Sequence, residues 1–355
     1  MKRTPAGQPL AKMAGKDISC PRRCSPRSGL RQMQKTILYL SHGGQKYHDQ
    51  TRYSVLTLLA QLIEHDRNDF RIAVYTDQPG QLPAHDLIQA MPVSPEDLVA
   101  WRGPLDYVHR IKLCLLRRAL RELGAPLIYV DSDTRWLQIP DAPFAALSGD
   151  GSPDPASPGP APPSPCYLYK IEGAISPTCF PQYFHLLRRN RSRLDAWRVP
   201  RDPPWTMWNS GTVGIPSRSV GFIDDVLQVT DALLPHVGYR NCVEQLALSL
   251  VASGRFKIRP FDAFLEHWWA YGSELPVYLR QRFFDALPPG LPVPEQAARA
   301  GRFSIAESHL RAIQRRPANR VVRWCAKVRA SFYKRRIDLL AFALRWRTVA
   351  AGRAD

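Results

Sequence analysis

Two aspartates separated by a single residue, Asp131 and Asp133, directly follow the apolar run 127–130. Carboxylates at this spacing can face one cation, and hard divalent cations such as Mg²⁺ prefer oxygen ligands. A cation held there could neutralise negative charge that develops on a leaving diphosphate, which is Lewis-acid chemistry. The alternative is a solvated turn that carries two acids, so the pair by itself does not define a site.

The elements around this pair predict where it lies. The run Leu-Ile-Tyr-Val at 127–130 is typical of a strand buried on both faces, as in parallel sheets. Further strands are predicted at 36–40, 71–77, 166–175 and 212–215, and helices at 51–64, 105–122, 181–198, 219–234 and 241–253. This alternation predicts an open α/β sheet flanked by helices. Ligands of such sheets bind beyond the carboxyl ends of the strands, where Asp131 and Asp133 lie.

Three later segments carry residues suited to a ligand site. Asn209-Ser210-Gly211 precedes the strand 212–215; glycine permits a close backbone approach, and asparagine offers a donor and an acceptor. Glu244-Gln245 opens an apolar helix. His267 lies among aromatic residues, so it is either a packed side chain or a further metal ligand. Each segment also has an ordinary structural interpretation as a turn, a helix start or part of the core.

The strand followed by Asp-Ser-Asp-Thr-Arg-Trp resembles the DxD motif of GT-A glycosyltransferases, which use nucleotide-sugar donors and usually Mn²⁺ or Mg²⁺. Over roughly residues 36–275, the order of the motifs at 209–211, 244–245 and 267 is similar to that of family GT8. The resemblance implies a GT-A fold, a Rossmann-like open mixed sheet flanked by helices. It also implies a metal-dependent hexosyltransferase that moves a sugar from a nucleotide-diphosphate donor to an acceptor hydroxyl.

The same resemblance implies roles for individual residues. The metal ligands would be Asp131, Asp133 and His267; Glu244, Gln245 and Asn209 would be the catalytic residues; donor contacts would come from Asp77, Arg110, Ser210 and Gly211. Arg110 and Lys112 both resemble basic positions that contact donor phosphates in several GT-A enzymes. They are about 200° apart around a helix, so they are not expected to face one ligand together.

Two departures favour the GT-A class over family GT8 itself. Glu244 stands where that family usually has Asp, and Trp-Trp-Ala-Tyr-Gly follows His267 instead of a segment that contains Lys.

The net charge of +18 resides in the ends of the chain. Residues 1–35 hold nine Lys and Arg against one acid, 311–355 hold thirteen against two, and 36–310 have a net charge of −1. A near-neutral middle argues against a nucleic-acid-binding protein. We expect a disordered basic extension at 1–34, a catalytic domain at 35–310 with a Pro/Gly/Ser-rich loop at 148–165, and a basic amphipathic helical tail at 311–355.

The remaining expectations concern location and partners. No apolar run reaches the roughly 18 residues of a spanning helix, and the seven cysteines form no CxxC pair, which suits a reducing compartment. We expect a cytoplasmic protein whose basic tail binds the inner, anionic face of a membrane. The expected partners are a nucleotide sugar and a glycan or lipid-linked acceptor, without nucleic acid. Met33, just before the first strand, is an alternative start.

Three alternatives stay open. The first is a catalytically silent GT-A-like protein that binds a nucleotide or a glycan. The second is a basic nucleic-acid-binding protein, and the third is a nucleotidyltransferase, for which no Gly-rich phosphate loop follows the first strand. The sequence leaves the sugar, the acceptor, the stereochemical course and the oligomeric state open.

Overall fold

The computed structural model describes residues 34–124, 126–149, 164–196, 199–217, 219, 221–238 and 240–315. The predicted extension 1–34, apart from Gln34, lies outside the described residues. Most of the predicted loop 148–165 and the predicted tail beyond residue 315 also lie outside them. Within the described part, no helix is long and apolar enough to cross a membrane.

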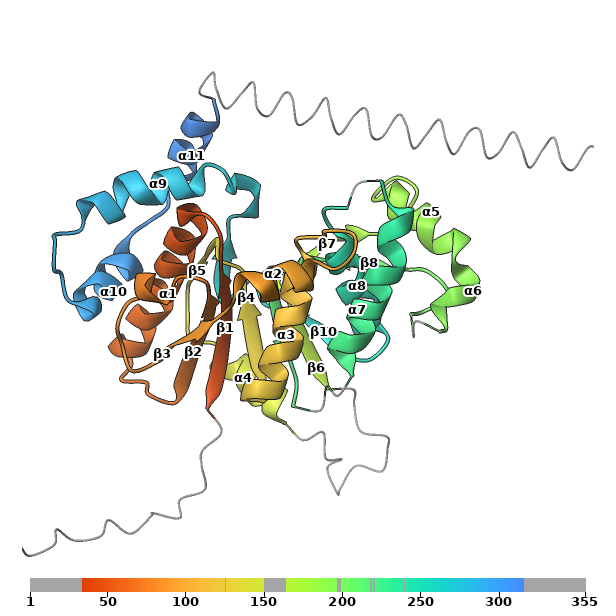
Figure 1. Ribbon diagram of the computed structural model, residues 1–355, viewed down its shortest axis with the longest axis horizontal. Helices are drawn as coiled ribbons and strands as arrows, with labels where there is room; N and C mark the ends of the chain where they lie inside the picture. The colour runs from red at the N-terminus through yellow and green to blue at the C-terminus, as the bar shows by residue number, and fades with distance from the viewer. Residues whose placement is uncertain are drawn as a thin grey trace, which may run out of the picture. The chain divides into compact units, whose positions relative to one another are not determined.

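Seven strands form one mixed sheet in the order β10-β6-β9-β4-β1-β2-β3 (Figure 1). Their bounds are β1 Lys35–Ser41, β2 Phe70–Thr76, β3 Ile88–Pro92, β4 Leu127–Val130, β6 Pro165–Leu168, β9 Thr212–Ile215 and β10 Lys257–Pro260. Strand β9 runs antiparallel to both of its neighbours, β4 and β6, and the other neighbouring pairs are parallel. The predicted open mixed sheet flanked by helices is therefore confirmed.

Helices cover both faces of this sheet because successive side chains of its strands point to opposite sides. Ile37 and Tyr39 of β1 belong to a core shared with α1 and α4, whereas Leu38 belongs to a core shared with α3, α7 and α8. The helix bounds are α1 Gln45–Glu64, α2 Pro95–Arg102, α3 Arg110–Leu123, α4 Asp141–Ser148, α5 Pro181–Arg189, α6 Arg191–Leu194, α7 Phe222–Leu233 and α8 Val243–Ser253.

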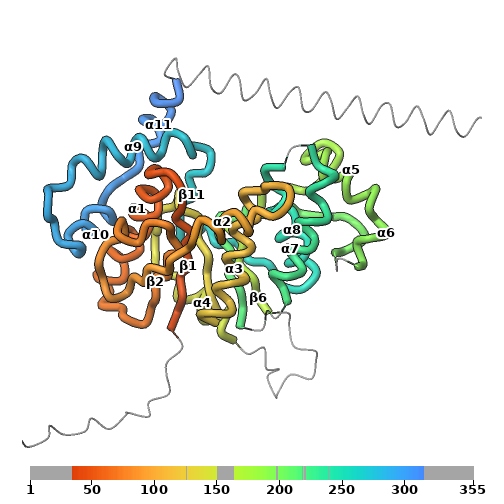
Figure 2. Tube along the Cα trace, in the orientation of Figure 1, coloured from red at the N-terminus to blue at the C-terminus, as the bar shows by residue number. Residues whose placement is uncertain are grey.

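A third layer packs on the outer side of α1. It consists of α9 Leu275–Arg282, α10 Val293–Arg302 and α11 Glu307–Gln314. Tyr53, Leu56 and Leu59 of α1 share a buried cluster with these helices, which Figure 2 shows in blue beside the red-orange α1. Helix α11 crosses the predicted domain boundary at residue 310, and Ile313 belongs to the same buried cluster. The other domain boundaries stay predictions.

Two small antiparallel sheets lie outside the main sheet, and they position the residues discussed below. In one, β5 Thr134–Trp136 pairs with β11 Leu265–His267, with Thr134 opposite His267. In the other, β7 Ile171–Ala174 pairs with β8 Thr206–Trp208, with Ile171 opposite Trp208. Each small sheet joins segments that are far apart in the sequence.

The structure corrects several predicted boundaries. The predicted strand 166–175 is two strands, β6 and β7, separated by Tyr169 and Lys170. The helical stretch 181–198 is broken into α5 and α6, and strands β3 and β10 were not predicted. The partly exposed strand β10 lies at an edge of the sheet and lacks a continuous apolar run.

Candidate active site

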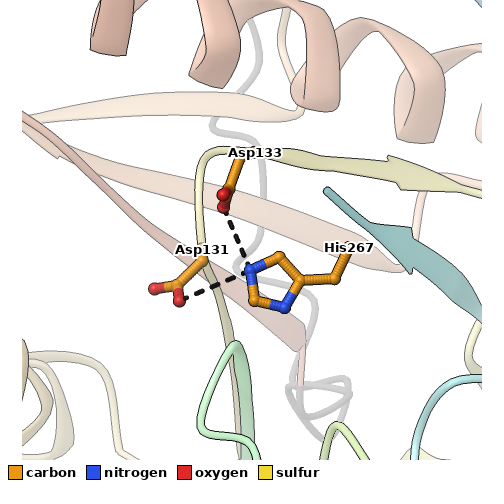
Figure 3. Close-up of side chains that lie close together, drawn as sticks. All are labelled: Asp131, Asp133 and His267. Atoms are coloured by element: carbon orange, nitrogen blue, oxygen red, sulfur yellow. Dashed lines mark hydrogen bonds and ion pairs between the residues drawn. The ribbon is translucent and has the colours of Figure 1, made fainter. Parts of the chain in front are cut away.

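Three predicted ligands meet at the carboxyl end of β4. Asp131 and Asp133 follow this strand directly, and the pairing of β11 with β5 brings His267 to them (Figure 3). The Nε2 atom of His267 lies 3.1 Å from Oδ1 of Asp133 and 3.9 Å from Oδ2 of Asp131. All three ligand atoms lie within 4.8 Å of one another. Asp133 and His267 are 134 positions apart in the sequence, and tertiary structure brings them together with Asp131 in one cluster.

The imidazole ring of His267 is held by packing. A Cβ atom added to Gly211 would overlap Cε1 and Nδ1 of the ring, so only glycine leaves room for the ring here. On another side, the ring meets Tyr169 edge-on with 5.1 Å between ring centroids. The buried Nδ1 atom has no hydrogen-bond partner among the described residues. Close approach to Gly211 and Tyr169 therefore orients the ring.

Lys112 of α3 is buried and faces the same carboxylates. Its ammonium lies 3.1 Å from Oδ1 of Asp131 and donates to the backbone oxygen of Ser210 at 3.1 Å. Tyr129 donates its hydroxyl proton to Oδ1 of Asp131 at 2.7 Å. Burial by itself lowers the pKa of Lys112, but the negative charges of Asp131 and Glu244 outweigh it and the net pKa is raised. The ammonium is therefore charged at neutral pH.

Asp133 and His267 also shift each other's pKa. Burial acts to raise the pKa of Asp133, but the positive charge and hydrogen bond of His267 lower it below its ordinary value. Burial acts to lower the pKa of His267, but the charge and hydrogen bond of Asp133 raise it. Both shifts favour an ion pair in which the Nε2–H group of His267 donates to Asp133.

The donor set fits a divalent cation. Neighbouring ligands around Mg²⁺ at about 2.1 Å are about 3 Å apart, and opposite ligands are about 4.2 Å apart. The separations of 3.1 and 3.9 Å between His267 Nε2 and the two aspartates fall in this interval. Two carboxylates and one imidazole combine oxygen ligands suited to Mg²⁺ and Mn²⁺ with a nitrogen ligand suited to transition metals. Asp131, Asp133 and His267 are therefore the residues that could hold such an ion.

Glu244 opens α8 and is buried beside Lys112. Its Oε2 atom accepts a hydrogen bond from the Tyr107 hydroxyl at 2.5 Å, and its Oε1 atom accepts one from the Ser210 hydroxyl at 3.4 Å. Burial, followed by the charge and hydrogen bond of Glu244, raises the pKa of Tyr107 far above its ordinary value, so the tyrosine stays neutral and donates. This contact between Tyr107 and Glu244 was not predicted from the sequence.

Asn209 and Gln245 are brought together by a residue that the sequence did not single out. Glu172 of β7 accepts a hydrogen bond from Nδ2 of Asn209 at 2.7 Å and another from Nε2 of Gln245 at 2.8 Å. The amide oxygens face the other way: Oδ1 of Asn209 accepts from the backbone N–H of Gly211, and Oε1 of Gln245 accepts from that of Ser210. The 209–211 segment and the start of α8 thus form one network.

Two predicted donor contacts lie outside this network. Arg110 forms a double hydrogen bond with Asp231, at 2.8 and 2.9 Å, and does not face Asp131. The helical spacing that separates Arg110 from Lys112 turns Lys112, and not Arg110, toward Asp131. The donor contact of Arg110 stays a prediction. Asp77 follows β2 and accepts the backbone N–H of Gly43 at 2.9 Å, so it joins the loops after β1 and β2.

Lys112 was named with Arg110 as a basic position but was not chosen as a donor contact, although the sequence held a usable signal for it. A lysine in an otherwise apolar helical stripe, with Ile111 and Leu115 buried around it, indicates a buried cation that needs an acidic partner. Glu172 gave no such signal, because a glutamate in a short strand is ordinary. Its role appears only through the pairing of β7 with β8.

Comparisons with known proteins add the following findings. No protein-family model and no curated protein sequence matches the chain. The structure is similar to that of the galactosyltransferase LgtC in complex with donor and acceptor sugar analogs, with 12% identity and a TM-score of 0.36 over 61% of this chain and 70% of that chain. The structure of an active-site mutant of LgtC is similar with 11% identity and a TM-score of 0.32, over 60% of this chain and 69% of that chain. The structure of the glycosyltransferase GlyE in Streptococcus pneumoniae TIGR4 is similar with 11% identity and a TM-score of 0.36, over 74% of this chain and 53% of GlyE. With TM-scores this low, the similarity assigns no role to any residue of this chain.

Proposed function

We propose that the chain is a divalent-metal-dependent glycosyltransferase that transfers a sugar from a nucleoside diphosphate to an acceptor hydroxyl. The observation that carries the proposal is the cluster of Asp131, Asp133 and His267 at the carboxyl edge of the sheet. Ligand sites of open α/β sheets lie at this edge. The resemblance of the motif order to GT-A enzymes supports the same reaction.

The charges of the site support a diphosphate ligand together with a metal ion. Asp131, Asp133, Glu172 and Glu244 contribute four carboxylates to the connected network, whereas Lys112 is the one ammonium among their contacts in the described residues. A bound Mn²⁺ or Mg²⁺ would supply Lewis-acid neutralisation of the leaving diphosphate. Lys112, next to Asp131, would bind a phosphate oxygen of the donor.

Glu244 is the acid that we place beside the reacting carbon. Tyr107 and Ser210 hold its two oxygens, and Ser210 also contacts Lys112, which links Glu244 to the side of the site that binds the metal. A carboxylate fixed by donors on both oxygens loses little freedom when it stabilises positive charge on a sugar carbon. Ser210 and Gly211 would line the donor, since Gly211 O accepts the backbone N–H of Asp131 at 2.8 Å.

A donor screen tests this function. Purified protein would be incubated with a panel of nucleoside diphosphate sugars and Mn²⁺, and the release of free nucleoside diphosphate would be measured with and without EDTA. We expect turnover that EDTA abolishes. The variant that carries both Asp131→Asn and Asp133→Asn should show no turnover. The exposed Asp285→Asn is the matched control and should keep full activity. Turnover that survives the double substitution would refute the metal role.

The screen also separates an enzyme from a silent binding protein. Titration with UDP and GDP, in the presence and absence of Mn²⁺, measures binding without turnover. A protein that binds either nucleotide only with metal, yet releases none from any donor, would be the silent GT-A-like alternative. A protein that binds neither would contradict the proposal as a whole.

The proposed place of action is the inner face of a membrane, where the acceptor would be a glycan or a lipid-linked saccharide. The support is the basic sequence 311–355, of which only residues 311–315 are described. Each cation near an anionic surface contributes on the order of 1 kcal/mol. Deletion of 319–355 should release the protein from vesicles that contain phosphatidylserine, and unchanged flotation with those vesicles would reject this role.

A further inference from the structure

Glu172 is a carboxylate that the proposed reaction has not yet used. It lies on β7, partly exposed, next to the segment 209–211 that leads into the metal cluster. No Lys or Arg of the described residues forms an ion pair with it, whereas Asp131 has Lys112 and Asp133 has His267. Two neutral amides hold it instead, which leaves its full negative charge to act on whatever binds beside it.

The chemistry of its partners fixes how these amides point. The backbone N–H groups of Ser210 and Gly211 can only donate, so they require the amide oxygens of Gln245 and Asn209. The amide nitrogens must therefore face Glu172, which can only accept. The main chain thus orients both amides on one side, and each amide donates one N–H hydrogen bond to Glu172 on the other.

The carboxylate that results still has room to accept hydrogen bonds. A carboxylate has about four lone-pair sites, and Asn209 and Gln245 use one on each oxygen. The sites left on Oε1 and Oε2 suit two O–H donors. A diphosphate would be repelled by this charge, whereas an uncharged group that carries hydroxyls suits Glu172.

We infer that Glu172 accepts hydrogen bonds from hydroxyl groups of the transferred sugar, and that Asn209 and Gln245 are positioning residues that aim it. This inference rests on the proposed function. It gives the two amides, which the resemblance placed among the catalytic residues, a positioning role instead. The specificity of the enzyme for its sugar then depends on a carboxylate that accepts hydrogen bonds from two hydroxyl groups.

Binding measurements on matched ligands test the inference. Wild type and Glu172→Gln would be titrated calorimetrically, with Mn²⁺, against UDP and GDP and against UDP-glucose, UDP-galactose and GDP-mannose. Glu172→Gln keeps the size of the side chain but removes its charge and one acceptor. We expect the Kd for the nucleoside diphosphate to change by less than about twofold. The Kd for the corresponding nucleotide sugar should rise about tenfold, the scale of a lost hydrogen bond to a charged group.

A second variant isolates the positioning role. Asn209→Asp keeps an oxygen that accepts the Gly211 N–H but loses the N–H that holds Glu172 and places a like charge beside it. It should also weaken the nucleotide sugar about tenfold and spare the nucleoside diphosphate. Glu295→Gln, on the exposed face of α10, should change neither. Thermal unfolding of each variant shows whether the fold is retained.

The outcomes are distinct. An equal loss of affinity for the nucleoside diphosphate and the nucleotide sugar in Glu172→Gln would mean that Glu172 only maintains the network, and the inference would be overturned. Unchanged affinity for both ligands would overturn it as well. If wild type binds no member of the panel, the proposed function itself fails, and the inference falls with it.

Discussion

Replacement of Gly211 by alanine should disrupt the proposed metal site of Asp131, Asp133 and His267 without removing any of these side chains. The added methyl carbon would overlap two atoms of the His267 ring and would lie 2.9 Å from Oδ1 of Asn209. Non-bonded carbon atoms pack at about 3.5–4.0 Å, so the ring must retreat by more than about 1 Å. The hydrogen bond from Nε2 of His267 to Asp133 is 3.1 Å long, and a shift of that size breaks it.

The size of the effect follows from two costs. Insertion of a methyl group into a packed site costs about 1–3 kcal/mol of folding stability. Metal sites tolerate ligand displacements of only about 0.2 Å, so the displaced imidazole is lost as a ligand. We expect Gly211→Ala to bind Mn²⁺ at least about tenfold more weakly than wild type, as substitutions that misplace metal ligands commonly do.

Two further glycines provide controls. A Cβ atom on Gly80 would meet nothing within 4 Å, so Gly80→Ala should leave both stability and Mn²⁺ affinity unchanged. A Cβ atom on Gly214 would lie 2.9 Å from Cβ of Tyr167 in the main sheet, so Gly214→Ala should destabilise the fold and spare the metal cluster. These two variants separate loss of a ligand from loss of the fold.

The assay combines Mn²⁺ titration, followed by the electron paramagnetic resonance of the free ion, with thermal unfolding of the metal-free protein. The expected pattern is weak Mn²⁺ binding in Gly211→Ala alone, with lowered melting temperatures in Gly211→Ala and Gly214→Ala. Wild-type Mn²⁺ affinity in Gly211→Ala would refute the packing argument for His267. Absence of Mn²⁺ binding in the wild type would refute the metal site.

Two more predictions concern stability. Tyr107→Phe removes the hydrogen-bond donor to buried Glu244 and should lower the free energy of unfolding in urea by about 1.5–3 kcal/mol. Tyr271→Phe loses a similar hydrogen bond to exposed Glu307 and should lower it much less. Equal losses would contradict the role of burial. The hydrogen bonds of Arg67, and then those of Lys35, lower the pKa of Asp141 to about 2, despite an opposing effect of burial. Its ionised form therefore stabilises the fold above the unfolded pKa of about 4, and this contribution is lost as the pH falls from about 4 to 2. As the pH is lowered from 6 to 2, the melting temperature should fall less steeply for Asp141→Asn than for wild type. Parallel curves would contradict the prediction.

The sequence by itself determined the class of fold and the location of Asp131 and Asp133. A short apolar run specifies a buried strand because each of its residues must leave water, and all four residues of β4 are indeed buried. The polar residues that end such a strand must lie at the edge of the sheet, which places Asp131 and Asp133. These inferences use only neighbours in the chain, and for that reason they could be made without a structure.

Tertiary structure decided which distant residues complete the site. His267 reaches the aspartates because β11 pairs with β5, and the choice between Lys112 and Arg110 depends on how α3 is rotated against the sheet. Glu172 belongs to the network only because β7 pairs with β8. Such contacts depend on the register of strands and the rotation of helices, which packing of the whole domain sets and no local pattern records.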